Sequence, residues 1–162
     1  MNLSEPVRIR PDIPKEYGVP DKAEGMLDWS WVSEQLKAAK NYWLVSTYPD
    51  GRPHTVPSWG AWAANKLYFS GGDMTRHHKN LLVNPGMIAH LESGSEVVIV
   101  YGTAEPAVDV PPEIMAEVEA DYSKKYGNPE GATFALVPEK ILAWKEFPST
   151  PTKFVFEPPA TE

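Results

Sequence analysis

YWLVSTYPDGRPHTVPSWG, residues 42–60, points to an antiparallel β-structure. Its first part, 42–48, is rich in β-branched and aromatic residues, which is typical of a strand. Pro49-Asp50-Gly51 then supplies turn chemistry, so we expect a second strand over 54–62. Pro53 and Pro57 cannot donate to a ladder, which predicts that this second strand lies at an edge or carries a bulge.

The neighbouring segments extend this pattern on both sides. A third strand is expected over 67–70, so that three consecutive strands form an antiparallel meander. A short helix is predicted over 75–84, capped by Thr75, with Leu81 and Leu82 facing inward. Before the first strand, Asp28 and the helical spacing of apolar residues predict a helix over 28–40.

The rest of the chain adds strands without a regular β-α-β alternation. We expect a helix over 111–125 and strands over 87–92, 97–107, 133–137, 141–146 and 153–156. This order predicts a mainly β fold, a closed or nearly closed antiparallel barrel with flanking helices. The proposed organisation is a proline-rich extended arm over 1–27, one barrel domain over 28–157 and a tail over 158–162.

Composition excludes several classes of function. The 162 residues carry a formal net charge of −7 and a pI near 5.1, so a general nucleic-acid binder or an anionic-membrane binder is not expected. The absence of cysteine excludes disulfides, thiolate metal sites and thiol nucleophiles. No apolar run reaches the length of a signal peptide core or a membrane span, and we expect a cytoplasmic protein.

Residues 70–81, SGGDMTRHHKNL, contain the strongest candidate for an anion site. A strand leads into two glycines and then into a helix whose first turn carries a hydroxyl and cationic groups. Unpaired N–H groups and the helix dipole favour a phosphate there, and the Arg76 guanidinium can bind two oxygens at once. Thr75 would donate its hydroxyl, while His77 or Lys79 would add charge. The alternative is that Thr75 only caps the helix and the basic residues form a solvated face.

The proline-containing strand is the second candidate. Its unpaired backbone groups could bind the polar edge of a flat heterocycle, with His54 and Trp59 as stacking or hydrogen-bonding partners. The alternative is an edge strand whose aromatic residues pack under a partner subunit. No residue is assigned as catalytic, because the chain has no nucleophile motif, and the four histidines lack the spacing of a metal site.

Taken together, these motifs resemble the pyridoxamine 5′-phosphate oxidase-like family, and more closely its flavin/deazaflavin oxidoreductases. The resemblance covers about 28–156 and depends on the order and spacing of short motifs. They are Tyr42-Trp43-Leu44-Val45-Ser46-Thr47, Asp50-Gly51-Arg52-Pro53-His54, Pro57-Ser58-Trp59-Gly60, Leu67-Tyr68-Phe69-Ser70, Thr75-Arg76, Asn80-Leu81, Asn84-Pro85, Tyr101-Gly102-Thr103-Ala104, Lys125-Tyr126-Gly127, Pro138 through Trp144, and Thr152-Lys153-Phe154-Val155-Phe156.

The resemblance implies a homodimeric split β-barrel with FMN, or the deazaflavin coenzyme F420, in a groove between the subunits. The family's phosphate-binding Ser/Thr-Arg-Lys element maps onto Thr75, Arg76 and His77, where His77 replaces the usual Lys and Lys79 could compensate. Lys153 stands where many relatives carry an Arg that reaches the cofactor. The remaining implied cofactor-binding residues are the strand that lies along the ring system and two flanking positions: His54, Thr55, Val56, Pro57, Ser70 and Asn80.

The function that the resemblance implies is reduction of a small conjugated or heteroaromatic substrate by an FMN- or F420-dependent oxidoreductase. Two alternatives stay open: a non-catalytic flavin- or haem-binding module on the same fold, and a pyridoxamine 5′-phosphate oxidase. The oxidase is less favoured because no second basic cluster is found for a substrate phosphate. The acidity of the chain slightly favours FMN over F420, whose long anionic tail would benefit from a further basic groove.

Overall fold

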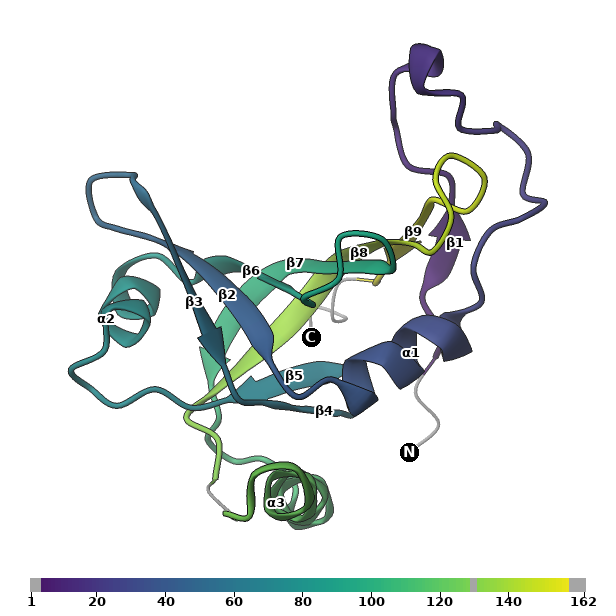
Figure 1. The fold of residues 1–162 in the computed structure, drawn as a ribbon. Coiled ribbons are helices and arrows are strands. Elements are labelled where there is room, and N and C mark those ends of the chain that lie inside the picture. Colours follow the sequence, from purple (N-terminus) through teal and green to yellow (C-terminus); the bar gives the residue numbers. More distant parts are fainter. Residues whose placement is uncertain (1–3, 129–130, 158–162) are drawn as a thin grey trace.

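The fold is an antiparallel sheet flanked by three helices, in a computed structural model that describes residues 4–128 and 131–157 (Figure 1). The helices are α1 (Trp29–Ala38), α2 (Arg76–Val83) and α3 (Pro112–Tyr126), with a 3-10 turn at Lys15–Tyr17. The strands are β1 (Val7–Ile9), β2 (Tyr42–Thr47), β3 (Pro53–Ser58), β4 (Ala61–Ala63), β5 (Lys66–Phe69), β6 (Gly86–His90), β7 (Val97–Pro106), β8 (Phe134–Trp144) and β9 (Thr152–Val155). They confirm the mainly β class predicted from the sequence.

The sheet has the strand order β1-β9-β8-β7-β6-β2-β3, and β5 joins it by pairing with β8. The β2–β3 hairpin confirms the first two predicted strands, with Tyr42 opposite Ser58 and Thr47 opposite Pro53. Because β3 pairs only with β2 on this path, it is an edge strand, as its two prolines predicted.

The predicted strand over 54–62 is wrong in one respect, because it breaks at Trp59 and Gly60. Its first part is β3, and its second part is β4, which pairs with β5 instead of continuing beside β2. The meander is therefore interrupted. Gly60 explains the break: an added Cβ would lie 3.0 Å from Tyr42 and 3.0 Å from Leu67, so the backbone crosses there at close range to two core side chains.

The predicted strands over 133–137 and 141–146 are one strand, β8. The pairing with β7 shifts between Tyr101, opposite Lys140, and Gly102, opposite Pro138, which leaves Glu139 as an extra residue. Pro138 has no N–H to donate, and it lies directly beside this irregularity, where the ladder is already interrupted. Residues 138–140, between the two predicted strands, therefore belong to one continuous strand that contains a bulge.

The N-terminal arm takes part in the sheet, which the sequence did not predict. Within the arm, β1 pairs antiparallel with β9, and Val7 lies opposite Val155. Arg10 then holds the following loop by donating to four carbonyl oxygens, those of Lys22, Glu24, Ser149 and Pro151, at 2.6–2.9 Å. Figure 1 shows this loop projecting from the body next to the segment that joins β8 to β9.

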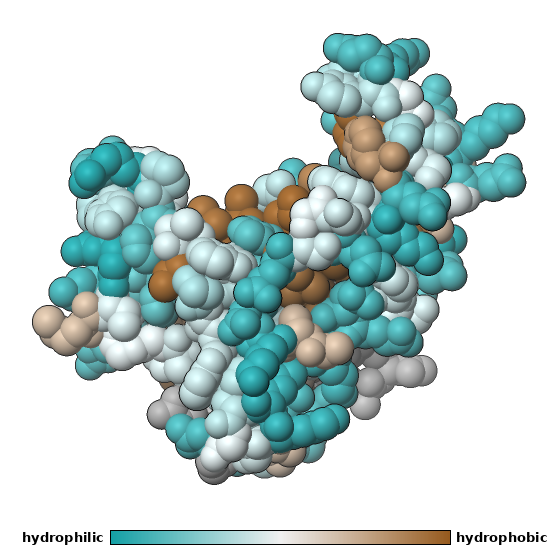
Figure 2. Space-filling view, viewed as in Figure 1, coloured by the Kyte–Doolittle hydropathy of each residue, from teal (hydrophilic) through white to brown (hydrophobic). Residues whose placement is uncertain are grey.

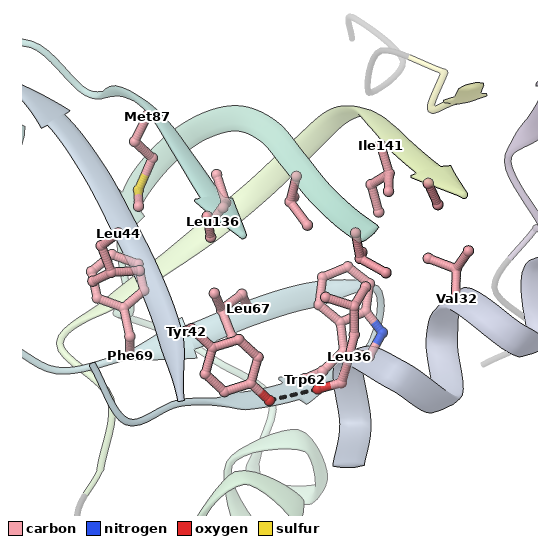
Figure 3. Packing of buried hydrophobic residues seen from close by; sticks show 14 of the residues in the cluster. Val32, Leu36, Tyr42, Leu44, Trp62, Leu67, Phe69, Met87, Leu136 and Ile141 are labelled. Atoms are coloured by element: carbon pink, nitrogen blue, oxygen red, sulfur yellow. Dashed lines mark hydrogen bonds between the residues drawn. The ribbon is translucent and has the colours of Figure 1, made fainter. Parts of the chain in front are cut away.

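The main core lies between α1 and the inner side of the sheet (Figure 3). Val32 and Leu36 of α1 are buried with Tyr42, whose hydroxyl donates to the Leu36 carbonyl at 2.5 Å. A second cluster lies under α3, around Val118 and Tyr122. On α2 only one of the two leucines predicted to face inward does so: Leu81 is buried, whereas Leu82 is 67% exposed. Among the described residues no helix is long and apolar enough to cross a membrane.

Gly102 generates a stability prediction at the β7–β8 bulge. A Cβ there would lie 2.0 Å from the carbonyl oxygen of Val137, so Gly102→Ala must displace backbone and should cost about 1–3 kcal/mol of unfolding free energy. Gly94→Ala is the control, because a Cβ at Gly94 meets no atom within 4 Å. Urea unfolding measures both variants, and equal stabilities would contradict the close approach.

Candidate functional site

The loop between β5 and α2 is closed by the helix cap that the sequence predicted. The Thr75 Oγ1 accepts from the backbone N–H of His78 at 3.4 Å, and its hydroxyl donates to the Gly72 carbonyl at 2.8 Å. Thr75 therefore caps α2 and ties the helix to the glycine loop. The first N–H groups of an α-helix have no partner within the helix, so this end of α2 carries partial positive charge.

Two adjacent histidines of α2 contact backbone carbonyl groups of the same loop. The Nε2 of His77 lies 3.3 Å from the Ser70 carbonyl, and the Nδ1 of His78 lies 3.1 Å from the Gly71 carbonyl. Since a carbonyl only accepts, each of these nitrogens carries a proton. Gly71 has no room for a side chain, because an added Cβ would lie 2.3 Å from His77 Nε2. The histidine pair thus fixes the path of the loop.

Arg76, the first residue of α2, lies beside an aromatic ring of the β2–β3 hairpin. Its guanidinium carbon is 5.0 Å from the centroid of Tyr48, and the guanidinium carbon of Arg52 is 4.9 Å from the same centroid. Asp50 pairs with Arg52 at 2.8 Å. Two guanidinium groups therefore gather around one ring in a chain that is acidic as a whole, and both remain exposed.

Asn80 links Arg76 to the sheet. Its amide Nδ2 donates to the Ser46 hydroxyl of β2 at 3.0 Å, and both side chains are buried. Its Oδ1 accepts from the Arg76 guanidinium at 3.5 Å. This chain of contacts sets the distance of α2 from β2 and limits where the Arg76 side chain can lie.

His54 of β3 completes the cluster. Its ring meets Tyr48 edge to face, with 5.7 Å between the centroids, and it is close enough to His77 to disfavour a positive charge there. The Nδ1 of His54 is buried and has no hydrogen-bond partner among the described residues. A buried polar atom without a partner is costly, so this nitrogen is suited to a ligand that reaches the edge of β3.

An open cleft of about 340 Å³ lies between the end of β3 and the glycine loop. Its lining residues come from β3, the break that follows it, the loop before α2, and α3: Pro57, Ser58, Trp59, Ser70, Gly71, Gly72 and Tyr122. The cleft borders the loop that leads into α2, through Ser70, Gly71 and Gly72. No group of three or more His, Asp or Glu residues suited to a metal ion occurs within 4–128 and 131–157.

The comparisons with known proteins identify the family. The sequence profile of the family described as pyridoxamine 5′-phosphate oxidase matches residues 32–145. The chain belongs to this family. No curated protein shows significant sequence similarity to it.

Solved structures share the fold of this family member. A haem-binding protein from Mycobacterium smegmatis is 16% identical, with a TM-score of 0.61 over 76% of this chain and 56% of the other. A FAD-binding protein from Mesorhizobium loti is 19% identical, with a TM-score of 0.58 over 81% and 96% of the two chains. A protein described as an F420 reductase is 19% identical, with a TM-score of 0.51 over 67% and 94%. At these identities the likeness shows the split-barrel fold.

The structure brings most of the predicted cofactor residues of this family member into one region. His54, Ser70, Thr75, Arg76, His77 and Asn80 surround the glycine loop and the start of α2, and Pro57 lines the adjoining cleft. Thr55 and Lys79 lie nearby on the surface, whereas Val56 packs against the main core. His77 and Asn80 face inward and position the loop and the helix, so their direct contact with a phosphate stays a prediction.

Among the predicted cofactor residues, Lys153 lies far from the start of α2 within a single chain. It lies on β9, between Leu142 of β8 and Ile9 of β1, and Figure 1 shows these strands at the other end of the sheet from α2. Conversely, sequence reasoning did not assign Ser46, Tyr48 or Arg52 to the site. The signal for Arg52 was its place in the hairpin turn, since a short turn returns β3 alongside β2 and brings its cation beside Tyr48.

The buried contact of Asn80 gives a second prediction. Asn80→Ala leaves the buried Ser46 hydroxyl without this partner, which should lower the unfolding free energy by about 1–3 kcal/mol. Asn84→Ala is a matched control, since Asn84 also makes a side-chain hydrogen bond but lies exposed at the end of the same helix. Urea unfolding compares them. A smaller loss for Asn80→Ala than for Asn84→Ala would contradict the proposed docking role.

His77 gives a prediction about pH. Burial, and then the nearby His54 and His78, lower its pKa from the ordinary value of 6.5, although the Ser70 carbonyl opposes this. The unfolded imidazole takes up a proton first, so stability is lost as pH falls below about 6.5. We expect the wild type to lose more unfolding free energy than His77→Gln between pH 7.5 and pH 5.5, since the amide can donate to Ser70 without titrating. Identical losses in urea unfolding would refute this.

Proposed function

We propose that the protein is an oxidoreductase that binds FMN or the deazaflavin coenzyme F420, with the cofactor phosphate at the start of α2. The observation that carries this proposal is the pair of guanidinium groups, Arg76 and Arg52, gathered around Tyr48 beside the helix N-terminus and the glycine loop. The chain as a whole is acidic, but the two guanidinium groups make this one place locally positive and suited to an anion.

The residues present fit a phosphate-bearing ring compound. Arg76 can bind phosphate oxygens in a bidentate way, and it is the first residue of α2, whose N-terminal end carries partial positive charge. The unpaired Nδ1 of His54 and the prolines of β3 leave polar groups along an edge where a heterocycle can hydrogen-bond. The cleft that ends at Trp59 extends away from the phosphate position and provides room for a ring.

A bound flavin or deazaflavin supplies hydride or electron transfer, and the chain supplies binding, orientation and exclusion of water. Arg76 and Arg52 would compensate the negative charge of the phosphate. His77 and His78 would hold the glycine loop through their contacts with the Ser70 and Gly71 carbonyl groups. Held in this way, the ring would lie along the edge of β3. The substrate would be a small conjugated or heteroaromatic compound.

The choice of FMN over F420 depends on charge. Structural neighbours are described as FAD-binding and as an F420 reductase, and all these cofactors combine a flavin-type ring with phosphate groups. The described cations of this site are concentrated at one position, around Tyr48. One phosphate group therefore matches the site better than the long anionic tail of F420, and we propose FMN as the first candidate.

We also propose that the cofactor lies between two copies of the chain. Along β2, β6, β7 and β8, residues that alternate with the core are half-buried and mostly apolar: Trp43, Val45, Ile88, Ile99 and Leu142. In Figure 2 hydrophobic residues lie in the hollow between the two projecting parts of the molecule. Lys153 neighbours Leu142 in the ladder, so a second copy seated on this face could bring Lys153 to the anion site.

A non-catalytic carrier is the second candidate. One structural neighbour is described as haem-binding, and the unpaired imidazole nitrogen of His54 is the kind of atom that binds haem iron. The absorption spectrum of the protein as isolated separates these cases, because flavin, deazaflavin and haem absorb at different wavelengths. Rapid reoxidation of the reduced cofactor by a substrate would then distinguish an enzyme from a carrier.

The role of Arg76 is tested by substitution. Arg76→Ala removes a charge-assisted contact to the phosphate and should weaken FMN binding by about 1.5–3 kcal/mol, or roughly ten- to hundredfold in Kd. Fluorescence titration of FMN into each protein measures the change. Lys37→Ala is the control, because Lys37 is an exposed cation of α1 paired with Glu117 of α3. Equal affinities of Arg76→Ala and Lys37→Ala would remove Arg76 from the site.

A further inference from the structure

Strand β8 has two different neighbours along one of its edges. On the edge away from β7, β5 pairs with residues 134–136 and β9 pairs with residues 140–143. Residues 137–139 lie between these two pairings, so β5 and β9 diverge there and leave a fork in the sheet. The Phe156 N–H donates to the Glu139 carbonyl at 3.0 Å, and this bond holds the end of β9 at the fork.

A second cleft, here called the fork cleft, opens at this point. Its first part, of about 390 Å³, lies between the β4–β5 turn, residues 4–7 and the end of β9. Its second part, of about 520 Å³, continues over the β8 bulge. The two parts share the lining residues Glu105, Val137, Pro138, Phe156 and Glu157. Neither part is lined by a residue assigned above to the cofactor or to the contact between two copies. Volumes of this order can hold a small organic molecule.

Much of the lining of the fork cleft is apolar and yet open to solvent. Val7 of β1 lies opposite Val155 of β9 in the ladder, and Val137 and Pro138 contribute from β8. Val7 is 55% exposed, whereas Val137, Val155 and Phe156 are partly exposed. A ligand that removes these groups from water gains free energy, in proportion to the apolar area that it covers.

The wall formed by the β4–β5 turn has a defined conformation. Ala64 and Asn65 have φ values of 49° and 56°, the left-handed conformation that a tight two-residue hairpin turn uses. The next residue, Lys66, pairs with Glu105 of β7 at 2.8 Å. This ion pair ties the turn to β7, and it compensates the positive charge of Lys66 within the lining.

The charged groups of the fork cleft are mostly acidic. Its described lining includes the carboxylates of Glu5, Glu105, Glu139 and Glu157, and Lys66 is the one cation in that lining. Since Lys66 is already paired with Glu105, three carboxylates have no cation beside them in the described lining. An anionic ligand would be repelled here, whereas a cation with an apolar body complements both the charge and the surface.

We propose that the fork cleft binds a small organic cation, a protonated aliphatic amine whose chain covers the apolar lining while its ammonium group faces the carboxylates. This site goes beyond the proposed function and does not depend on it. Opposite charges separate the ligands of the two sites: the guanidinium groups around Tyr48 suit a phosphate, and the carboxylates of the fork cleft suit an amine.

The test uses n-octylamine as the probe, titrated by calorimetry into the full chain at pH 7.5 and low salt. Octanoate, which has a chain of the same length and the opposite charge, is the matched ligand. Octylamine should bind at least about tenfold more tightly than octanoate, and the difference should shrink as salt is raised. Equal affinities of the two compounds, or no measurable binding of octylamine, would overturn the proposal.

Substitution of the carboxylates locates the bound amine. The double variant Glu105→Gln/Glu157→Gln removes two negative charges that line both parts of the cleft and should weaken octylamine binding about tenfold. The control is Glu113→Gln/Glu119→Gln, which changes the net charge equally at exposed positions of α3, outside the lining. Equal octylamine affinities of the two double variants would contradict binding in the fork cleft.

A larger side chain tests the apolar part of the site without changing its charge. Val155→Phe places a ring in the fork cleft and should weaken octylamine binding about threefold or more. Val83→Phe makes the same change at a position of α2 that is 66% exposed and should have no effect. Equal octylamine affinities of these two variants would show that the chain of the amine lies elsewhere.

The cofactor provides the last comparison. The octylamine affinity of the wild type should be the same with and without FMN, because the two sites share no residue. Competition between octylamine and FMN would place the amine at the cofactor site and overturn the proposal. A wild type that binds octylamine but no FMN would defeat the proposed function alone and leave the fork cleft supported.

Discussion

The hydrogen bond between Asn80 of α2 and Ser46 of β2 is the contact on which the site depends. Both groups are buried, so neither can exchange its partner for water without a cost in free energy. The bond sets the separation of α2 from the hairpin. With α2 in that position, Arg76 lies beside Tyr48, and the loop before the helix borders the cleft. The edge strand, the glycine loop and the helix N-terminus then form one continuous surface.

The electrostatics of this surface differ from those of the whole chain. With a net charge of −7, the protein repels anions at long range, so an anionic ligand must be held by short-range contacts. Arg52 and Arg76 can provide such contacts. His77 is buried, which lowers its pKa and favours the neutral ring, and its role is to bind the Ser70 carbonyl of the loop. His77 therefore supports the loop, and Arg52 offers a second cation from the hairpin.

Local signals were sufficient for much of the fold and for part of the site. The cap at Thr75 and the edge hairpin were predictable, because capping and turn chemistry act within a few residues. The break at Gly60 and the bulge at Glu139 were missed, since both depend on contacts with distant strands. Tyr48 and Arg52 were missed for a related reason: the hairpin turn brings these two residues together, but their approach to Arg76 depends on how α2 packs against β2.

The most direct test of the central claim is the affinity of the protein for FMN relative to riboflavin, which has the same ring and lacks the phosphate. If the cations around Tyr48 hold the phosphate, FMN should bind at least about tenfold more tightly than riboflavin, and the ratio should fall as salt is raised. Equal affinities for the two compounds at low salt would contradict the account, because they would show that the site beside α2 contributes nothing to cofactor binding.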